Sequence, residues 1–186
     1  MVRDERPEAL GPSGPKRGIR LLCPDVYVST DVTDIEPAVL YAAGVRAALL
    51  DLDNTLVGWQ RSDLSDRVRA WLCSMREAGI GLYLVSNTRY GKRLTALSAD
   101  LGIPYVRRAW KPRRRGFLAA MEAMQVTPEE TVMIGDQMFT DVLGANRLGI
   151  RTFMVRPLAR REFLGTKLSR LVERVLLLWF RRMGWI

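Results

Sequence analysis

The sequence predicts an α/β fold in which helices cover both faces of a mostly parallel β-sheet. One observation is that short apolar runs, which are typical of buried strands, alternate with segments of helical periodicity. Another is that polar residues follow several of these runs directly, as they do at the carboxyl ends of parallel strands. Parallel strands need crossover connections, and helices supply them on both sides of the sheet. Together these observations predict a three-layer α/β/α architecture.

The expected elements follow in order from the apolar pattern. Mainly apolar runs flanked by turn residues predict an extended piece at residues 26–28 and strands at 45–51, 80–85, 103–106, 131–134 and 150–155. Between them, apolar residues recur at helical spacing, and most of these segments end in a glycine, which is typical of a helix end. The expected helices are a short one closed by Gly44, one capped by Ser65 or Asp63 and ended by Gly79, and three more at 92–101, 114–124 and 141–148.

Composition divides the chain into three parts. Residues 1–18 combine prolines and glycines with charges, so they cannot bury enough apolar surface to offset the entropy of ordering, and we predict a flexible tail. Residues 19–174 contain the alternating elements of one globular domain. Residues 175–186 are a basic amphipathic C-terminal extension.

Bulk properties exclude several classes of protein. No apolar run reaches the roughly 20 residues of a membrane-spanning helix, and the first residues lack the apolar core of a secretory signal. The two cysteines, Cys23 and Cys73, fit neither a disulfide framework nor a metal-ligand spacing, so we expect a cytoplasmic protein with reduced thiols. The chain has no histidine, which excludes a Ser-His-Asp triad and a histidine-ligated zinc site.

Polar motifs stand at or just beyond the carboxyl ends of four expected strands. In chain order they are Asp51-x-Asp53-x-Thr55, Ser86-Asn87-Thr88, Lys111-Pro112 and Gly135-Asp136-Gln137-x-x-Thr140-Asp141. Each motif alone is weak, because a single aspartate or serine commonly caps a helix or turn and a single lysine is usually a solvated charge. The carboxyl ends of parallel strands lie along one edge of a sheet, so we expect the four motifs to meet in one crevice.

Carboxylates, hydroxyls and an ammonium group in one crevice suit a phosphate and a magnesium ion. Mg²⁺ prefers oxygen ligands, which Asp51 and Asp136 can supply as carboxylates and Asp53 through its backbone carbonyl. The net charge of +9 and the pI near 10.2 favour an anionic partner, such as nucleic acid, an acidic membrane surface or a phosphorylated substrate.

The ordered set of motifs resembles the haloacid dehalogenase-like phosphatase superfamily over roughly residues 45–155. The resemblance implies a Rossmann-like fold and an aspartyl-phosphate mechanism, with Asp51 as the nucleophile and Asp53 as the general acid and base. It also implies that Lys111 holds the charge of Asp51 and of the phosphoryl group. Substrate contacts are expected from Thr55, Ser86 and Asn87, and Mg²⁺ ligands from Asp51, Asp53, Asp136 and Asp141, the last either as a ligand or as an orienting residue.

Finer details are similar to subfamily III, type A, in a group that resembles phosphatidylglycerophosphate phosphatases. They are the stretches Asp51–Trp59, Ala109-x-Lys111-Pro112, Gly135–Arg147, Leu22–Tyr27 and Val155-x-Pro157, which extend the resemblance to about residues 20–174. The spacing between motifs leaves no room for a cap domain, and capless members tend to act on large or surface-bound substrates. The resemblance therefore implies removal of the terminal phosphate from phosphatidylglycerophosphate to give phosphatidylglycerol.

The C-terminal segment could serve a lipid substrate. From Lys167 onward, apolar residues recur at helical spacing with arginines between them. Such a helix could lie in the interface of an anionic membrane, on its inner face, or dock on the sheet with its arginines solvated. We expect docking through about Arg174, and both possibilities stay open for residues 177–186.

Two rival hypotheses remain at this stage. A phosphatase acting on a soluble sugar, a nucleotide or a nucleic-acid terminal phosphate would use the same residues. A non-catalytic binder of nucleic acid or anionic membranes would explain the positive charge, but no nucleic-acid-binding motif is recognisable, so we do not expect nucleic acid as the partner.

Overall fold

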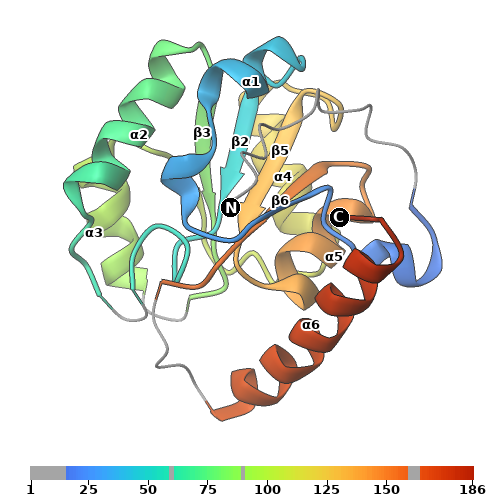
Figure 1. Ribbon diagram of the computed structural model, residues 1–186. Coiled ribbons are helices and arrows are strands. Elements are labelled where there is room, and N and C mark those ends of the chain that lie inside the picture. The colour runs from blue at the N-terminus through green and yellow to red at the C-terminus, as the bar shows by residue number, and fades with distance from the viewer. Residues whose placement is uncertain (1–15, 59–60, 89–90, 159–163) are drawn as a thin grey trace, which may run out of the picture.

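A parallel sheet forms the centre of the computed structural model, which describes residues 16–58, 61–88, 91–158 and 164–186 (Figure 1). Within these residues the sheet order is β1-β6-β5-β2-β3-β4, and each neighbouring pair is parallel, as the alternating pattern predicts. The strands are β1 (Val26–Val28), β2 (Ala47–Leu50), β3 (Gly81–Val85), β4 (Tyr105–Val106), β5 (Thr131–Gly135) and β6 (Arg151–Val155). Most of the predicted tail, residues 1–15, lies outside the described residues.

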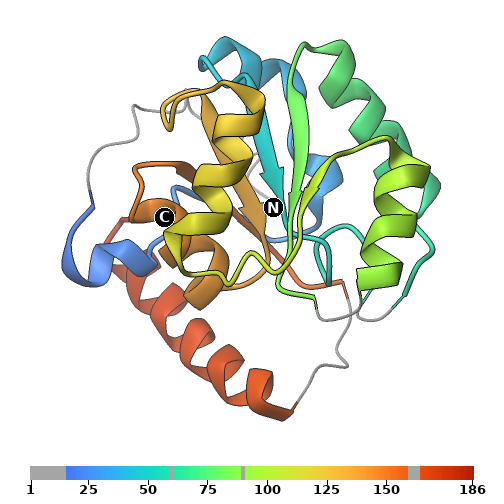
Figure 2. The same cartoon turned by 180° about the vertical axis from the view of Figure 1, so that it is seen from behind.

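Helices cover the sheet on both faces, which gives the three predicted layers (Figures 1 and 2). The α-helices are α1 (Pro37–Ala42), α2 (Asp66–Glu77), α3 (Gly91–Leu101), α4 (Arg114–Met124), α5 (Leu143–Asn146) and α6 (Leu164–Arg182). Side chains that alternate along β2 show which helices cover each face. Leu50 packs in the core cluster that contains α1, α2 and α3, whereas Leu49 packs with Phe117 of α4 on the other face. Ser65 caps α2 by accepting a hydrogen bond from the backbone N–H of Val68.

Helix α6 packs at the β1 and β6 end of the sheet. Its Phe180 is completely buried against Cys23, Met138 and Met154. Met154 points to the opposite face of β6 from Phe153, so α6 lies on the same side of the sheet as α4 and α5. The boundary expected at residue 174 falls inside this helix, and residues beyond it, including Phe180, belong to the core.

The sheet order creates a switch point beside β2. The chain passes from β2 to β3 and β4 on one side and then returns to β5 and β6 on the other. Ligands in open α/β sheets bind in the crevice outside the carboxyl ends of the strands at such a point. Asp51 follows β2 and Asp136 follows β5, so these two residues stand on adjacent strands at the switch point.

Two predicted boundaries differ from the structure near this edge. The strand expected at 45–51 ends at Leu50, because the chain turns into a tight loop in which Asn54 has a φ of +64°. The helix expected at 141–148 begins earlier, as a π-helical turn, η3 (Met138–Val142), and continues as α5. The turn is wide because the backbone N–H of Val142 donates to the carbonyl of Gln137, five residues before it, and shares this carbonyl with the N–H of Asp141.

The connections are short in the described part of the chain. The segments between β2 and β3 and between β3 and β4 contain α2 and α3, and no inserted cap domain is present among their described residues. No helix in the described residues has the length and apolar character needed to cross a membrane.

Candidate active site

Asp51 is the centre of the site. Its backbone N–H donates to the carbonyl of Ile134 at 2.9 Å, so the β2–β5 ladder fixes its position although the strand ends one residue earlier. Its side chain is almost completely buried, and Oδ1 accepts a hydrogen bond from the Lys111 ammonium group at 2.5 Å. The other oxygen, Oδ2, is buried and has no hydrogen-bond partner in the described residues. A buried carboxylate oxygen without a partner is costly unless it meets a ligand.

Lys111 lies between two carboxylates. Its Nζ atom is 2.5 Å from Asp51 Oδ1 and 2.7 Å from Asp141 Oδ1. Burial alone lowers the pKa of this lysine, but the carboxylates of Asp141 and Asp51 outweigh burial and raise the pKa above its ordinary value. Lys111 therefore stays charged in the site.

The loop after β3 holds the backbone at Lys111 in place. The Asn87 side chain donates to the Lys111 carbonyl at 2.9 Å and accepts from the Lys111 N–H at 2.8 Å. The Ser86 carbonyl accepts from the N–H of Ala109 at 3.1 Å, and the Ser86 hydroxyl accepts from the N–H of Thr88. Asn87 thus fixes the lysine loop in this structure, and the predicted substrate contacts of Ser86 and Asn87 remain predictions.

Asp136 is held from two sides. The Thr55 hydroxyl donates to Oδ1 at 3.4 Å, which brings the loop after β2 against the end of β5. Arg170 of α6 forms an ion pair with Oδ2 and also donates to the Asp136 backbone carbonyl at 2.5 Å. Burial raises the pKa of Asp136 well above its ordinary value, and the Arg170 guanidinium group opposes this shift.

Asp141 is positioned by η3 and by a glycine. Oδ2 accepts from the backbone N–H of Gln137 at 3.1 Å, while Oδ1 faces Lys111. A Cβ atom at Gly135 would lie 2.3 Å from Asp141 Oδ2, so the carboxylate can reach this place only because position 135 has no side chain. Since both of its oxygens have partners, Asp141 orients Lys111 in this structure.

The carboxylates fit a divalent cation. Among the described residues, Asp51, Asp136 and Asp141 bring one oxygen each within 4.8 Å of one another, and all three are buried. With Glu173, which Arg170 contacts at 2.9 Å, the cluster has four carboxylates against the two cations Lys111 and Arg170. Their excess negative charge and the partnerless Asp51 Oδ2 suit a hard cation with oxygen ligands. The Asp53 carboxylate lies outside this cluster.

Asp53 faces α3 instead. Its Oδ1 forms an ion pair with Arg93 at 2.7 Å, and the Arg93 Nε–H donates to the Arg61 carbonyl at 2.6 Å. The Asp53 side chain is 22% exposed, against 8% for Asp51. The nucleophile expected from the sequence is therefore the deeper carboxylate, and the expected acid and base is the one nearer solvent.

Burial sets the protonation of Asp51. It raises the pKa of this carboxyl group to about 7, with Lys111 opposing the shift and Asp141 adding to it. This value belongs to the protein without a cation, and a bound cation would favour the charged form.

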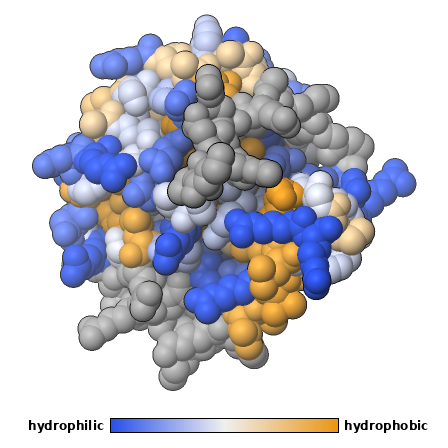
Figure 3. All heavy atoms as spheres, in the orientation of Figure 1, coloured by the Kyte–Doolittle hydropathy of each residue, from blue (hydrophilic) through white to orange (hydrophobic). Residues whose placement is uncertain are grey.

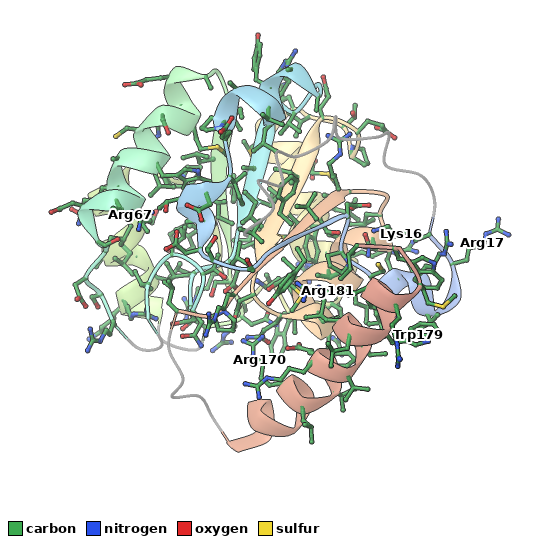
Figure 4. The ribbon with its side chains drawn as sticks, viewed as in Figure 1. Lys16, Arg17, Arg67, Arg170, Trp179 and Arg181 are labelled. Carbon is green, nitrogen blue, oxygen red and sulfur yellow. The ribbon has the colours of Figure 1, made fainter. Side chains whose placement is uncertain are left out.

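The sequence did not assign roles to Arg93, Arg170 and Glu173. Figure 4 shows Arg170 extending from α6, and its contacts place it on Asp136. Glu173 completes the group by accepting from the N–H of Met138 at 3.0 Å. The i, i+3 spacing of Arg170 and Glu173 is visible in the sequence. Only the packing of α6 shows that the face carrying them is turned to the site.

A family model and several relatives match the chain. The model described as haloacid dehalogenase-like hydrolase matches residues 33–149. "Probable phosphatase YqeG" of Bacillus subtilis is 38% identical over 167 residues, which cover 90% of this chain and 96% of the relative. The chloroplastic phosphatidylglycerophosphate phosphatase 1 of Chlamydomonas reinhardtii is 34% identical over 153 residues, 77% of this chain and 56% of that protein.

A second phosphatidylglycerophosphate phosphatase also matches most of this chain but only about half of its own length. The chloroplastic/mitochondrial phosphatidylglycerophosphate phosphatase 1 of Arabidopsis thaliana is 28% identical over 173 residues, which cover 88% of this chain and 49% of the relative. The chain thus spans about half the length of these two proteins, but nearly all of the bacterial one.

Solved structures share the fold. The cobalt-bound deoxy-D-mannose-octulosonate 8-phosphate phosphatase of Haemophilus influenzae has a TM-score of 0.50 and 20% identity, over 61% of this chain and 69% of that chain. An uncharacterized protein from Listeria monocytogenes serotype 4b has a TM-score of 0.51 and 20% identity, over 72% and 98%. At this identity the likeness concerns the fold alone. The family match, the phosphatase relatives and the buried carboxylates at the switch point all indicate the same chemistry. The chain belongs to the haloacid dehalogenase-like hydrolases and is a phosphatase.

Proposed function

We propose that this phosphatase removes the terminal phosphate from phosphatidylglycerophosphate, with Mg²⁺ as its cofactor. The observation that carries the reaction type is Asp51, a buried carboxylate with one oxygen on Lys111 and the other without a partner among the described residues. The substrate is supported by two relatives that bear this name and by a site edge over which the described residues build no cap domain.

The reaction begins with attack of a carboxylate oxygen of Asp51 on phosphorus. The bond from phosphorus to the ester oxygen of the lipid breaks, and Asp51 holds the phosphoryl group as an aspartyl-phosphate. Lys111 neutralises charge next to the nucleophile, since its Nζ atom is 2.5 Å from Asp51 Oδ1. Attack by water on the acyl phosphate then releases inorganic phosphate and restores the carboxylate.

Asp53 handles the protons. In the first step its protonated form gives a proton to the leaving ester oxygen, and in the second step the resulting carboxylate takes a proton from the attacking water. Its greater exposure suits this role, because the leaving group and the water both come from outside the buried cluster. Arg93 holds the Asp53 carboxylate at 2.7 Å and so sets its direction.

Asp51 and Asp136 would hold Mg²⁺ by their carboxylates, with the backbone carbonyl of Asp53 as a third ligand. The bound ion supplies positive charge that lets an anionic carboxylate approach an anionic phosphate. The Thr55 hydroxyl donates to Asp136 Oδ1 at 3.4 Å and so orients this carboxylate.

Phosphate release with Mg²⁺ tests this proposal. The purified chain is compared on phosphatidylglycerophosphate in detergent micelles and on soluble monoesters, including a sugar phosphate and a nucleotide. We expect the lipid to be the best substrate and Asp51→Asn to abolish release, because an amide cannot act as the nucleophile. Asp63→Asn, an exposed acid in the loop before α2, is the matched control and should retain activity.

The outcomes separate the hypotheses. Rapid turnover of a soluble monoester with none of the lipid would replace the substrate and keep the mechanism. Full activity of Asp51→Asn on every substrate would overturn the mechanism itself.

A further inference from the structure

Helix α6 has an outer face whose composition the fold does not explain. Leu171, Val175 and Leu178 recur at helical spacing and are 58%, 59% and 63% exposed. Val172, Trp179 and Met183 extend this apolar stripe along the same side and are also exposed. Figure 3 shows hydrophobic atoms gathered at the lower right, where Figure 1 places α6. We call these six residues the outer stripe.

Exposed arginines lie along one side of the outer stripe and at its C-terminal end. Arg174, Arg181 and Arg182 are exposed on the same helix, and Figure 3 shows hydrophilic residues against the hydrophobic patch. Lys16 and Arg17 lie near the C-terminal end of α6 in Figure 4. The single acidic residue after residue 168, Glu173, is buried and bonded to Arg170. The exposed charges of this helix are therefore all positive.

An apolar stripe with arginines beside it is the pattern of a helix that lies in the interface of an anionic bilayer. The apolar side chains enter the boundary between headgroups and acyl chains, and the arginines meet the lipid phosphates. A partner protein with an acidic rim could supply the same charges, but the net charge of +9 over the whole chain favours an extended anionic surface.

The same helix touches the catalytic site. Its inner face carries Arg170, which holds Asp136, and the outer stripe begins at the next residue, Leu171. The outer face thus lies about one helix diameter, roughly 10 Å, from the site edge. A bilayer under α6 would hold lipid headgroups about one helix diameter from the site edge, with no cap domain among the described residues between them.

We propose that the outer stripe of α6 docks the protein on an anionic lipid bilayer. The proposal rests on the proposed function only for its purpose, the delivery of a lipid substrate, since docking itself needs no catalysis. The helix stays attached to the sheet by Phe180 and to the site by Arg170, so docking requires no rearrangement of the fold.

Vesicle sedimentation tests the docking. The 186-residue chain with Asp51→Asn, which cannot consume a substrate, is mixed with vesicles of phosphatidylcholine alone or of phosphatidylcholine with phosphatidylglycerol. We expect strong binding to the anionic vesicles and weakening by salt. The double variant Val175→Ser/Leu178→Ser should bind at least about tenfold more weakly, because two apolar side chains no longer leave water.

A matched control and a second variant separate docking from misfolding. Leu118→Ser removes a leucine of α4 that is 48% exposed, and it should bind as the parent does. Arg174→Gln/Arg182→Gln keeps the stripe and should lose about fivefold affinity per arginine, on anionic vesicles only. Circular dichroism and thermal unfolding establish that each variant is folded.

Three results would overturn the proposal. They are no binding of the parent protein to anionic vesicles, equal binding of the parent and the stripe variant, and a stripe variant that turns a dimer in solution into a monomer. The last result would assign the stripe to contacts between copies. Hydrolysis of phosphatidylglycerophosphate in micelles without vesicle binding would remove the docking surface and leave the proposed function standing. Vesicle binding without lipid hydrolysis would keep the docking surface and remove the proposed substrate.

Discussion

At the scale of single residues, the burial of Asp51 makes stability depend on pH and also prepares the carboxylate for catalysis. Its pKa is raised to about 7 by burial, above its ordinary value of 3.8, so the folded protein without metal binds a proton that the unfolded chain has lost. The contribution of this group to stability is full below pH 3.8 and is lost as the pH rises to about 7. Above this pH the carboxylate is charged, and its partnerless oxygen, Oδ2, can bind a cation or attack phosphorus.

The first prediction concerns Mg²⁺ affinity and pH. Since a metal binds the deprotonated carboxylates, and the pKa of Asp136 is raised as well as that of Asp51, the apparent affinity should fall at least about tenfold for each pH unit below the Asp51 pKa. Isothermal titration of the metal-free protein at pH values on both sides of 7 measures this dependence. An affinity that does not change across that range would show that Asp51 is ionised without the metal.

The second prediction concerns Arg170. Its replacement by methionine leaves the completely buried Asp136 carboxylate without its ion pair, and we expect the free energy of unfolding to fall by about 3 kcal/mol in the absence of metal. Saturating Mg²⁺ should restore part of this loss, because a second cation then faces Asp136. Urea unfolding with and without Mg²⁺ measures both effects.

Arg174→Met is the matched control for Arg170→Met. Arg174 lies on the same helix but is exposed, so this change should alter the unfolding free energy by less than about 0.5 kcal/mol. Equal losses in the two variants would mean that Arg170 acts through α6 itself and not through Asp136.

At the scale of elements, the sequence predicted the site because parallel strands share an edge. Asp51, Ser86 and Asp136 each follow a strand, and the register of β2 with β3 and β5 brings their strand ends together. Lys111 comes shortly after a two-residue strand, and Asn87 fixes its backbone by two hydrogen bonds. The order of polar motifs was therefore enough to predict most of the buried cluster.

Other contacts depend on packing that a local pattern does not encode. Arg170 is one of several arginines on α6, and its choice of Asp136 follows from which face the burial of Phe180 turns inward. Arg93 reaches Asp53 only because α3 packs beside the loop after β2. The π-helical turn η3 was also missed, because its widened hydrogen bonds to Gln137 have no residue signature in the apolar pattern.

The third prediction tests how η3 is placed against β5. A methyl group at position 135 would overlap Asp141, so Gly135→Ala must push this carboxylate away from Lys111 and the N–H of Gln137. We expect phosphate release to fall about a hundredfold, since a misplacement of about 1 Å near the reacting groups has this effect.

Gly91→Ala provides the comparison for Gly135→Ala. A Cβ atom at position 91 would meet the Arg107 side chain at 3.4 Å, which is an ordinary contact, so activity should change little. Normal activity of Gly135→Ala would instead show that Asp141 can leave Lys111 without consequence.

At the scale of the whole molecule, the site joins elements that are distant in the chain. Asp51 comes from the end of β2, Lys111 from the loop before α4, Asp136 from the end of β5 and Arg170 from α6. The carboxylates of Asp51, Asp136 and Asp141 repel one another when no cation is bound, so this cluster weakens the fold at the switch point of the sheet. A ligand that bridges the carboxylates should therefore stabilise the entire domain.

The fourth prediction follows from this linkage. A ligand that binds only the folded protein adds about 2.7 kcal/mol at a concentration a hundred times its Kd. For a chain of 186 residues, saturating Mg²⁺ should raise the thermal midpoint by roughly 5–10 °C. Asp136→Asn removes one carboxylate and should lose most of this increase, whereas Asp63→Asn, exposed and outside the cluster, should keep it. Scanning calorimetry with and without Mg²⁺ measures the thermal midpoint. An unchanged midpoint in the parent protein would mean that the carboxylates at the switch point do not hold the ion.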